Sequence, residues 1–352
     1  MSRRVWRCPV VRRDRVPIYF TILVLLVVGM AFKAPWASAQ APLPIRIGYQ
    51  ATADWLLFTA RELKLFERVG LAPTYVKFVA GAPMIAAAES KSIDVATVGT
   101  VPFLMGLSQG VDWVMIGIHL EGAYAEGLVA RKDSGIDTLA DLKGKRIGYV
   151  RGSTTHYAVM MALRQLGLRP DQVTLLDMAP AGQVAAMAKG ELDAAAAWEP
   201  WMQRMVYEAN AKIIITEGDL GIYTDVGTYS ARRDWLRDNR GTAVRFLEAL
   251  IMAYGALQKD PMVGLRALAG EMEIKEAWAE TIYRDAPPPK ITEWANARYE
   301  YSLVKGSAFP RRLGYLATFL FDEKVIPQPV DVRDALDASV ITEALRTWKQ
   351  DQ

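Results

Sequence analysis

Short apolar runs alternate with segments of helical pattern along most of the chain, and turns rich in glycine, proline and polar residues separate them. Strands that alternate with helices are typical of α/β proteins, in which mostly parallel sheets carry helices on both faces. From Thr242 onward the pattern is helical throughout and is interrupted by prolines. The apolar runs predict strands at 42–49, 74–79, 93–98, 113–119, 127–131, 146–150, 173–177, 194–198 and 212–216, and the main helical segments lie at 55–68, 84–90, 157–166 and 183–189.

An internal repeat divides this pattern into two halves. The sequence Arg-Ile-Gly-Tyr occurs at 46–49 and again at 146–149, and each copy precedes a helical segment that ends in a Gly-Leu-x-Pro turn. Segments 86–96 and 185–195 are also similar, each with small residues, a turn and a buried strand. Similar motifs in one order indicate repeated structural units. The chain is therefore expected to form two similar lobes that face one another.

The order of the repeat predicts where the lobes begin and end. Residues 40–131 and 228–352 are assigned to the first lobe, with the C-terminal helices packed against it, and residues 132–227 form the second lobe. The segment at 229–235 resembles the one at 128–133 and is interpreted as the return crossing between lobes. Two such crossings would make a two-stranded hinge. About 310 residues exceed one comfortable hydrophobic core, which also favours two lobes.

The first 39 residues have the pattern of a secretory signal peptide. Six arginines precede an apolar run at 18–32, which is about fifteen residues long and short for a membrane span. Ala37-Ser38-Ala39 fits a cleavage site before Gln40. The mature protein is therefore expected in the periplasm, and an uncleaved anchor is the alternative. Cys8 precedes the apolar run, so it cannot be the lipid-bearing residue of a lipoprotein.

Removal of this segment changes the charge and the available chemistry. The segment carries a net charge of +6, so a whole chain of +3 leaves a mature part of about −3, which excludes an electrostatic case for nucleic-acid binding. Cys8 is the chain's one cysteine, so the mature part has neither a thiol nucleophile nor a disulfide. We expect no cofactor and no metal, because His119 and His156 stand in no metal-ligand spacing. Motifs of hydrolases, P-loop proteins and zinc proteases are absent from the sequence.

Adjacent hydroxyl residues follow the second Arg-Ile-Gly-Tyr strand and begin a helix. One of Ser153, Thr154 and Thr155 can cap that helix, and three exceed this need. A helix that begins beyond a strand end directs free N–H groups and the positive end of its dipole into the space there, where α/β clefts bind ligands. Thr100 stands at the equivalent strand end of the first half. The pattern predicts an anion site, and His156 is interpreted as an anion donor or a packing residue, with catalysis the least favoured role.

Further candidates lie around the same cleft. Trp198 ends a strand of small residues and could contact an apolar part of a ligand. Its neighbour Trp201 is interpreted as a core residue. Acidic side chains that could meet an ammonium group are Glu126, Glu199, Asp225, Glu121 and Asp54.

These residues resemble a known family, the periplasmic solute-binding proteins of ABC importers, in the group that binds nitrate, sulfonates and taurine. The resemblance rests on the signal peptide, both Arg-Ile-Gly-Tyr strands, the Ser-Thr-Thr-His-Tyr run at 153–157 and Trp198-Glu199-Pro200. It is closest to taurine-binding members through Gln50 and Thr52, and it covers residues 43–235 well. It implies a two-lobed clamp with type II crossings that closes on a small sulfonate and delivers it to a membrane permease and its ATPase. We expect this clamp to be a monomer.

The resemblance also implies alternatives and departures. The same clamp binds nitrate, bicarbonate or a pyrimidine precursor of thiamine in other members, and a related fold serves as an enzyme of thiamine-pyrimidine synthesis. Against the enzyme stand secretion and the lack of a lysine or cysteine cluster near residues 153–157. Val101 replaces one of the family's small residues after Thr100, and Trp55 and Glu199 also depart from the taurine-binding pattern. The sequence thus favours the anion end of a sulfonate site and leaves open which acid would pair with an amine.

Overall fold

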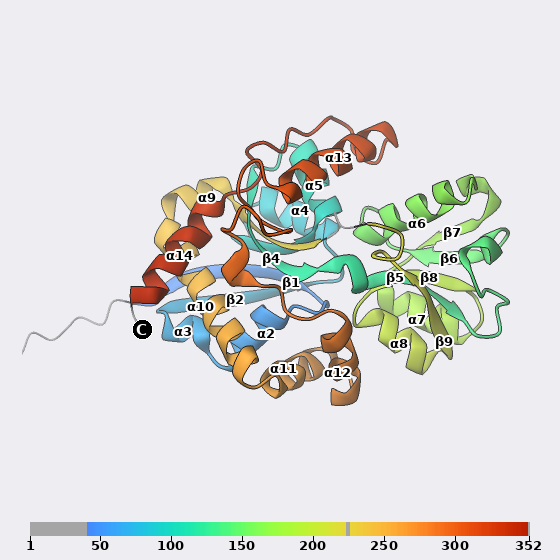
Figure 1. Cartoon of the computed structure of the whole chain (residues 1–352), viewed down its shortest axis with the longest axis horizontal. Coiled ribbons are helices and arrows are strands. Elements are labelled where there is room, and N and C mark those ends of the chain that lie inside the picture. The colour runs from blue at the N-terminus through green and yellow to red at the C-terminus, as the bar shows by residue number, and fades with distance from the viewer. Residues whose placement is uncertain (1–40, 223–225, 351–352) are drawn as a thin grey trace, which may run out of the picture. The chain divides into compact units, whose positions relative to one another are not determined.

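Two five-stranded mixed sheets organise the computed structural model, which describes residues 41–222 and 226–350. The first sheet has the order β2-β1-β3-β10-β4 and the second the order β7-β6-β8-β5-β9 (Figure 1). Strands of the first sheet are β1 (Leu43–Gln50), β2 (Leu71–Phe78), β3 (Val95–Gly99), β4 (Trp113–Glu121) and β10 (Val226–Arg232). Strands of the second are β5 (Glu126–Arg131), β6 (Arg146–Tyr149), β7 (Thr174–Asp177), β8 (Ala194–Trp198) and β9 (Ala211–Thr216). This confirms the predicted α/β class.

The two sheets follow one plan. In each, three parallel strands are followed by one antiparallel strand, β10 in the first and β5 in the second, and that strand pairs antiparallel with a fifth strand at the edge. The two Arg-Ile-Gly-Tyr strands, β1 and β6, occupy the same place in this order. The structure therefore confirms the internal repeat.

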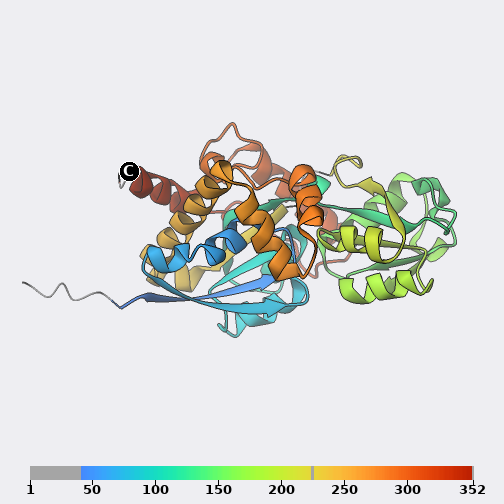
Figure 2. The same ribbon diagram turned by 90° about the horizontal axis from the view of Figure 1, so that it is seen from below.

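Helices cover both faces of each sheet (Figures 1 and 2). The first sheet carries helices from the N-terminal half, α2 (Trp55–Glu62), α3 (Leu65–Arg68), α4 (Ala82–Glu89) and α5 (Thr100–Ser108). It also carries the C-terminal helices α9 (Arg233–Asp238), α10 (Arg240–Lys259), α11 (Met262–Met272), α12 (Glu276–Asp285), α13 (Ala308–Asp322) and α14 (Ala338–Gln350), whose buried residues share one core with the sheet. The C-terminal helices therefore pack against the first sheet. The second sheet carries α6 (Thr154–Gln165), α7 (Pro180–Ala188) and α8 (Trp201–Glu208).

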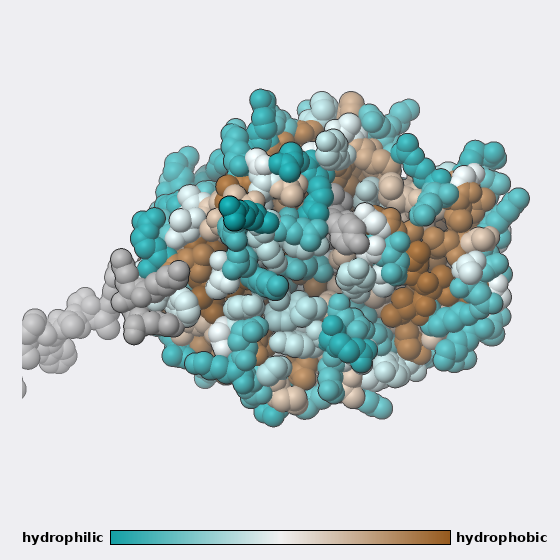
Figure 3. All heavy atoms as spheres, in the orientation of Figure 1, coloured by the Kyte–Doolittle hydropathy of each residue, from teal (hydrophilic) through white to brown (hydrophobic). Residues whose placement is uncertain are grey.

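The second sheet shows how strand alternation builds two small cores. Ala194 and Ala196 point to the α6 side, whereas Ala195 and Ala197 point to the side of α7 and α8. Alanine on both faces lets helices approach closely. Short 3-10 helices complete the connections, η1 (Gly122–Tyr124), η2 (Leu139–Leu142), η3 (Pro170–Gln172) and η4 (Ile291–Glu293). On the face drawn in Figure 3, hydrophobic residues gather over the region of β5, β8 and β9.

Two sequence predictions were wrong in detail. The helix expected over 55–68 is two helices, α2 and α3, because Lys64 has a left-handed backbone with φ of 52° that ends the first and lets the second begin. The segment assigned to the first lobe, 40–131, extends too far. Strand β5 pairs with β8 and β9, so it belongs to the second sheet. An apolar strand has the same pattern in either sheet, so periodicity could not assign it.

The chain passes twice between the sheets, from β4 to β5 and from β9 to β10. Side chains also make contacts between the two sheets and the segments that surround them. The indole N–H groups of Trp198 and Trp201 donate to the Ala51 carbonyl at 2.9 and 3.2 Å, and Tyr207 stacks on Trp278 with centroids 4.5 Å apart. Within the described ranges, no helix is long and apolar enough to cross a membrane. The predicted signal peptide lies outside the described residues.

Candidate functional site

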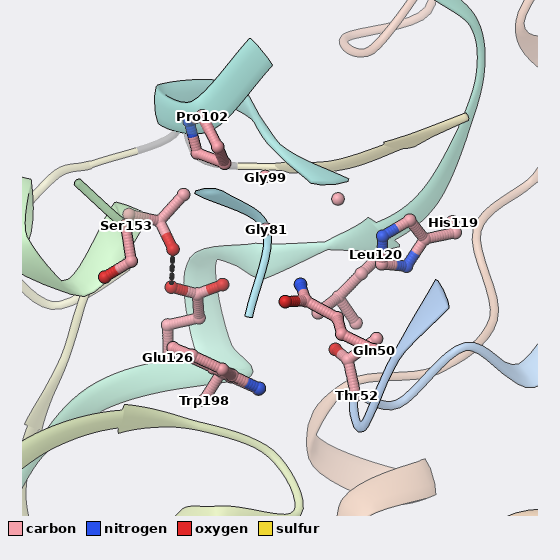
Figure 4. Close-up of a pocket in the computed structure, with 12 residues that line it drawn as sticks. Gln50, Thr52, Gly81, Gly99, Pro102, His119, Leu120, Glu126, Ser153 and Trp198 are labelled. Carbon is pink, nitrogen blue, oxygen red and sulfur yellow. Dashed lines mark hydrogen bonds between the residues drawn. The ribbon is translucent and has the colours of Figure 1, made fainter. Parts of the chain in front are cut away.

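A pocket, called the cleft below, lies where strand ends of both sheets meet (Figure 4). It holds ≈ 350 Å³ of space free of atoms, its open mouth included. The ends of parallel strands are where open α/β sheets bind ligands. From the first sheet and its helices the lining residues are Gln50, Thr52, Gly81, Gly99, Pro102, His119, Leu120 and Gly227, and from the second they are Glu126, Ser153, Thr154 and Trp198.

Two helix N-termini, one from each half of the repeat, meet at the cleft. Helix α5 begins after Gly99 and α6 begins after Ser153. They are close enough that a β-carbon on Gly99 would lie 2.6 Å from the Thr154 methyl carbon. The first turn of a helix carries N–H groups without partners inside the helix, and its dipole favours negative charge. The arrangement therefore suits an anion in the cleft.

The three hydroxyl side chains at the start of α6 make different hydrogen bonds. Ser153 is the N-cap among the three candidates. Its side chain accepts from the His156 backbone N–H at 3.3 Å and donates to the Val150 carbonyl at 2.7 Å. Thr154 directs its hydroxyl to a carboxylate oxygen of Glu126 at 2.5 Å. Thr155 is 2.8 Å from the Ser153 hydroxyl and is fully buried. The hydroxyls thus hold the helix start and Glu126 in place, and backbone N–H groups supply donors.

The charge of the cleft is unusual for an anion site. Its lining includes no lysine or arginine among the described residues, and Glu126 is its one charged side chain there. Glu126 and Gln50 lie on opposite sides, and in Figure 4 the Gln50 amide and the Glu126 carboxylate point toward one another. The Gln50 carbonyl oxygen has no hydrogen-bond partner among the described residues. The cleft therefore offers helix dipoles to an anion and a carboxylate to a cation.

A buried polar group lies behind the Gln50 side of the cleft. Asp54 caps helix α2, since its Oδ1 accepts from the Leu57 backbone N–H at 3.0 Å and from the Tyr229 hydroxyl at 2.6 Å. His119, from β4, is 1% exposed, and its Nδ1 lies 3.8 Å from Asp54 Oδ2. Burial raises the pKa of Asp54 to about 7 and lowers the pKa of His119 to about 3. The proximity therefore does not make an ion pair at neutral pH.

The structure brings some of the predicted site residues together and leaves others apart. Six of them line the cleft: Gln50, Thr52, Glu126, Ser153, Thr154 and Trp198. Four are not among the lining residues: Thr100, Thr155, His156 and Glu199. Asp225 lies outside the described residues. Glu199 is buried, and its carboxylate accepts hydrogen bonds from the backbone N–H and the side-chain amide of Gln203.

Sequence reasoning did not assign six lining residues to the site, namely Gly81, Gly99, Pro102, His119, Leu120 and Gly227. The structure explains why residue 227 is glycine, since a β-carbon there would lie 2.3 Å from the His119 ring. No sequence pattern indicates this contact. Among the residues that the structure describes, no group of three or more His, Cys, Asp or Glu side chains could hold a metal ion.

Glu199 gives a prediction about stability. Burial raises its pKa to about 8, whereas the free side chain titrates near 4.5. Between these values the unfolded chain binds fewer protons than the folded one, so stability falls as pH rises. His119 has the opposite effect, but only below its ordinary pKa of 6.5. From about pH 6.5 to about pH 8 we expect a loss of about 1–2 kcal/mol, measured by urea unfolding.

The matched variant is Glu199→Gln, which keeps the size of the side chain and removes its titration. Its stability should change much less over the same range, with the remainder due to Asp54, whose raised pKa of about 7 acts in the same direction. A variant as pH-dependent as the native protein would show that Glu199 titrates normally.

Comparisons with known proteins agree with this architecture. An Escherichia coli (strain K12) protein with the provisional name aliphatic sulfonates-binding protein is 26% identical over 90% of this chain and 96% of its own. The taurine-binding periplasmic protein of the same organism is 26% identical over 68% of this chain and 74% of its own. The solved structure of the alkanesulfonate-binding protein SsuA from Xanthomonas axonopodis pv. citri, bound to MOPS, has a TM-score of 0.72 and 26% identity, and covers 84% of this chain and 98% of that one.

The sequence profile of the NMT1/THI5-like family matches residues 55–263, which is more than half of the chain. The matched range includes strands of both sheets and both helix N-termini at the cleft. The chain therefore belongs to the NMT1/THI5-like family.

Proposed function

We propose that this protein is the periplasmic substrate-binding component of an ABC importer and that it binds a small sulfonate. The observation that carries the proposal is the meeting of the α5 and α6 N-termini at a cleft without lysine or arginine among its described lining residues. Each helix N-terminus stabilises a bound anion by about 0.3–2 kcal/mol, although it carries no full positive charge. A sulfonate is singly charged at every relevant pH, so it suits such a site better than a doubly charged phosphate.

The cleft also supports a finer choice among sulfonates. Trp198, Pro102 and Leu120 provide apolar surface for a short hydrocarbon linker. Glu126 lies beside the α6 N-terminus, so a ligand with an ammonium a few atoms from its sulfonate can meet both. This combination favours an amino-sulfonate such as taurine over a simple alkyl-sulfonate. The names of the two Escherichia coli relatives support the sulfonate class, and one of them supports taurine.

In this proposal each sheet and its helices form one lobe. The two lobes rotate about the two chain segments that connect the sheets, and they close on the ligand. The first lobe comprises residues 40–121 and 226–352, and the second lobe lies between them. Cleavage after Ala39 would release the mature protein into the periplasm without a lipid anchor. Its partners would be the permease and its ATPase in the inner membrane, and the protein would act as a monomer without a cofactor.

The proposal is tested by calorimetric titration of the purified mature protein with taurine, 2-hydroxyethanesulfonate, propane-1-sulfonate, nitrate, bicarbonate and hydroxymethylpyrimidine. We expect measurable binding of the sulfonates, with taurine the tightest, and none of the others at similar concentration. Propane-1-sulfonate has a methyl group in place of the taurine ammonium and so isolates the charge. Binding of nitrate or a pyrimidine without binding of any sulfonate would overturn the proposal.

The alternative to a binding protein is an enzyme. The proposal assigns no catalytic role, because the mature sequence has no cysteine and no nucleophile paired with a base lines the described part of the cleft. The titration also separates these roles. A binding protein should return the bound sulfonate unchanged, which mass spectrometry of the released ligand would verify.

A further inference from the structure

The buried polar group behind the cleft contains more polar atoms than it satisfies. Asp54 Oδ2 and both ring nitrogens of His119 have no hydrogen-bond partner among the described residues. Asp54 and His119 are each 1% exposed, so bulk water does not reach them. A buried polar atom without a partner costs free energy, and such atoms in folded proteins usually find a partner. This cluster therefore calls for an explanation beyond packing.

The Asp54 carboxyl has one engaged oxygen and one open oxygen. Oδ1 accepts two hydrogen bonds, from Leu57 and Tyr229, and Oδ2 is the oxygen that faces His119 Nδ1. Arg61 forms an ion pair with Glu271 and affects Asp54 only through space. A carboxylate without a paired cation is disfavoured in such a buried place, which is why the pKa of Asp54 is raised to about 7.

The protonated carboxyl determines the tautomer of the imidazole. With Oδ1 accepting, the proton stands on Oδ2, and from there it can be donated to Nδ1. The two atoms are 3.8 Å apart, so a shift of about 1 Å would bring them to hydrogen-bond distance. Burial keeps the ring neutral by lowering the pKa of His119 to about 3. A neutral ring that accepts at Nδ1 carries its hydrogen on Nε2.

The His119 ring borders the cleft. His119 and Gly227 both line the cleft, and a β-carbon on Gly227 would be 2.3 Å from Cε1 and 2.4 Å from Nε2 of the ring. Figure 4 shows the ring beside Leu120, on the Gln50 side. That β-carbon would also be 2.8 Å from Nδ1, so it would stand over the face of the ring, and glycine at 227 is what allows the ring to pack here beside the cleft.

We propose that Asp54 and His119 act together as one uncharged hydrogen-bond donor of the cleft, in which Asp54 sets the tautomer and His119 Nε2–H binds an oxygen of the ligand's sulfonate. This inference rests on the proposed function. His119 is then a binding residue and Asp54 a positioning residue. The charged or titratable groups that face the pair are Tyr229, Arg61 and, across the cleft, Glu126.

The pair makes sulfonate affinity depend on pH in a defined direction. When Asp54 loses its proton, its carboxylate becomes an acceptor toward Nδ1, the ring hydrogen moves to Nδ1, and Nε2 becomes an acceptor that no longer binds an anion. Loss of one neutral hydrogen bond corresponds to about a tenfold change in affinity. We therefore expect sulfonate binding to weaken about tenfold from about pH 6 to about pH 9, around the Asp54 pKa of about 7.

The experiment measures the affinity for propane-1-sulfonate, which does not titrate in this range, at several pH values. The key variant is Asp54→Asn. Asparagine is also a good helix N-cap, its oxygen can accept from Leu57 and Tyr229, and its amide donates to Nδ1 at every pH. This variant should bind as tightly as the native protein does at about pH 6 and should keep that affinity to about pH 9. His119→Leu should bind about tenfold more weakly at about pH 6 and show little pH dependence, and His119→Gln should recover part of the loss through its own N–H donor.

Three pH profiles would overturn the inference while the native protein still binds sulfonates. They are an affinity of the native protein that does not change with pH, a pH dependence that persists in Asp54→Asn, and a pH dependence that disappears instead in Glu199→Gln. A His119→Leu variant with native melting temperature and native affinity would also overturn it. Failure of the native protein to bind any sulfonate contradicts the proposed function itself, so the two failures are distinguishable.

Discussion

Replacement of Gly99 by alanine is expected to weaken sulfonate binding by between tenfold and a hundredfold. The β-carbon added at 99 would lie 2.6 Å from the Thr154 methyl carbon, well inside normal contact distance. Gly99 belongs to the first sheet and Thr154 begins α6 beside the second, so the clash would push the two helix N-termini apart. Overpacking of this kind costs about 1–3 kcal/mol, which corresponds to that range of affinity. Calorimetric titration with taurine measures it.

The matched control removes the Thr154 methyl group, with which the new β-carbon would clash. Thr154→Ser deletes the methyl group and keeps the hydroxyl that Glu126 accepts from. The double variant Gly99→Ala with Thr154→Ser should therefore recover most of the lost affinity. The backbone at Gly99 has φ of −68° and ψ of 164°, which alanine adopts without strain, so the melting temperature of the single variant should stay near that of the native protein. Native affinity in Gly99→Ala would mean that α5 and α6 do not approach this closely in the bound state.

The internal repeat was predictable from sequence because it has a physical basis in both halves. Arg46 and Arg146 each bind, through backbone and side-chain N–H groups, the aspartate that precedes the neighbouring strand, Asp94 and Asp193. The glycine of each motif is also explained. A β-carbon on Gly48 would lie 2.8 Å from Ile93, and one on Gly148 would lie 2.6 Å from Leu192. These contacts require the same residue types twice, so similarity at the level of sequence survives.

The cleft was only partly predictable. Strand ends and helix starts mark Gln50, Ser153 and Thr154, because polar residues interrupt apolar runs there. His119 is different, since it lies within a strand that is buried almost throughout. Nothing in the pattern of β4 distinguishes a side chain that faces a ligand from one that faces the core. Three adjacent hydroxyls exceed the need for one cap, which makes Thr155 a candidate from sequence, but in a helix it points about 100° away from Thr154.

Replacement of Glu126 by glutamine should separate amino-sulfonates from alkyl-sulfonates. Glutamine keeps the size of the side chain and an oxygen that can accept from Thr154, but it removes the charge that would pair with an ammonium. Loss of a buried charged hydrogen bond costs on the order of 1.5–3 kcal/mol, so taurine should bind tenfold to a hundredfold more weakly. Propane-1-sulfonate should bind the variant as well as it binds the native protein, or better.

The second half of that expectation follows from the charges in the cleft. Glu126 is the charged side chain of the described lining, and it stands beside the α6 N-terminus, where the sulfonate is proposed to bind. A carboxylate there repels an anion unless the ligand brings a cation with it, so its neutralisation removes a penalty that only the alkyl-sulfonate experiences. Equal losses for both ligands would make Glu126 a structural residue, and unchanged binding of both would place the amine against another acid. A gain for propane-1-sulfonate with a loss for taurine is the result that only direct pairing of Glu126 with the ligand's ammonium explains.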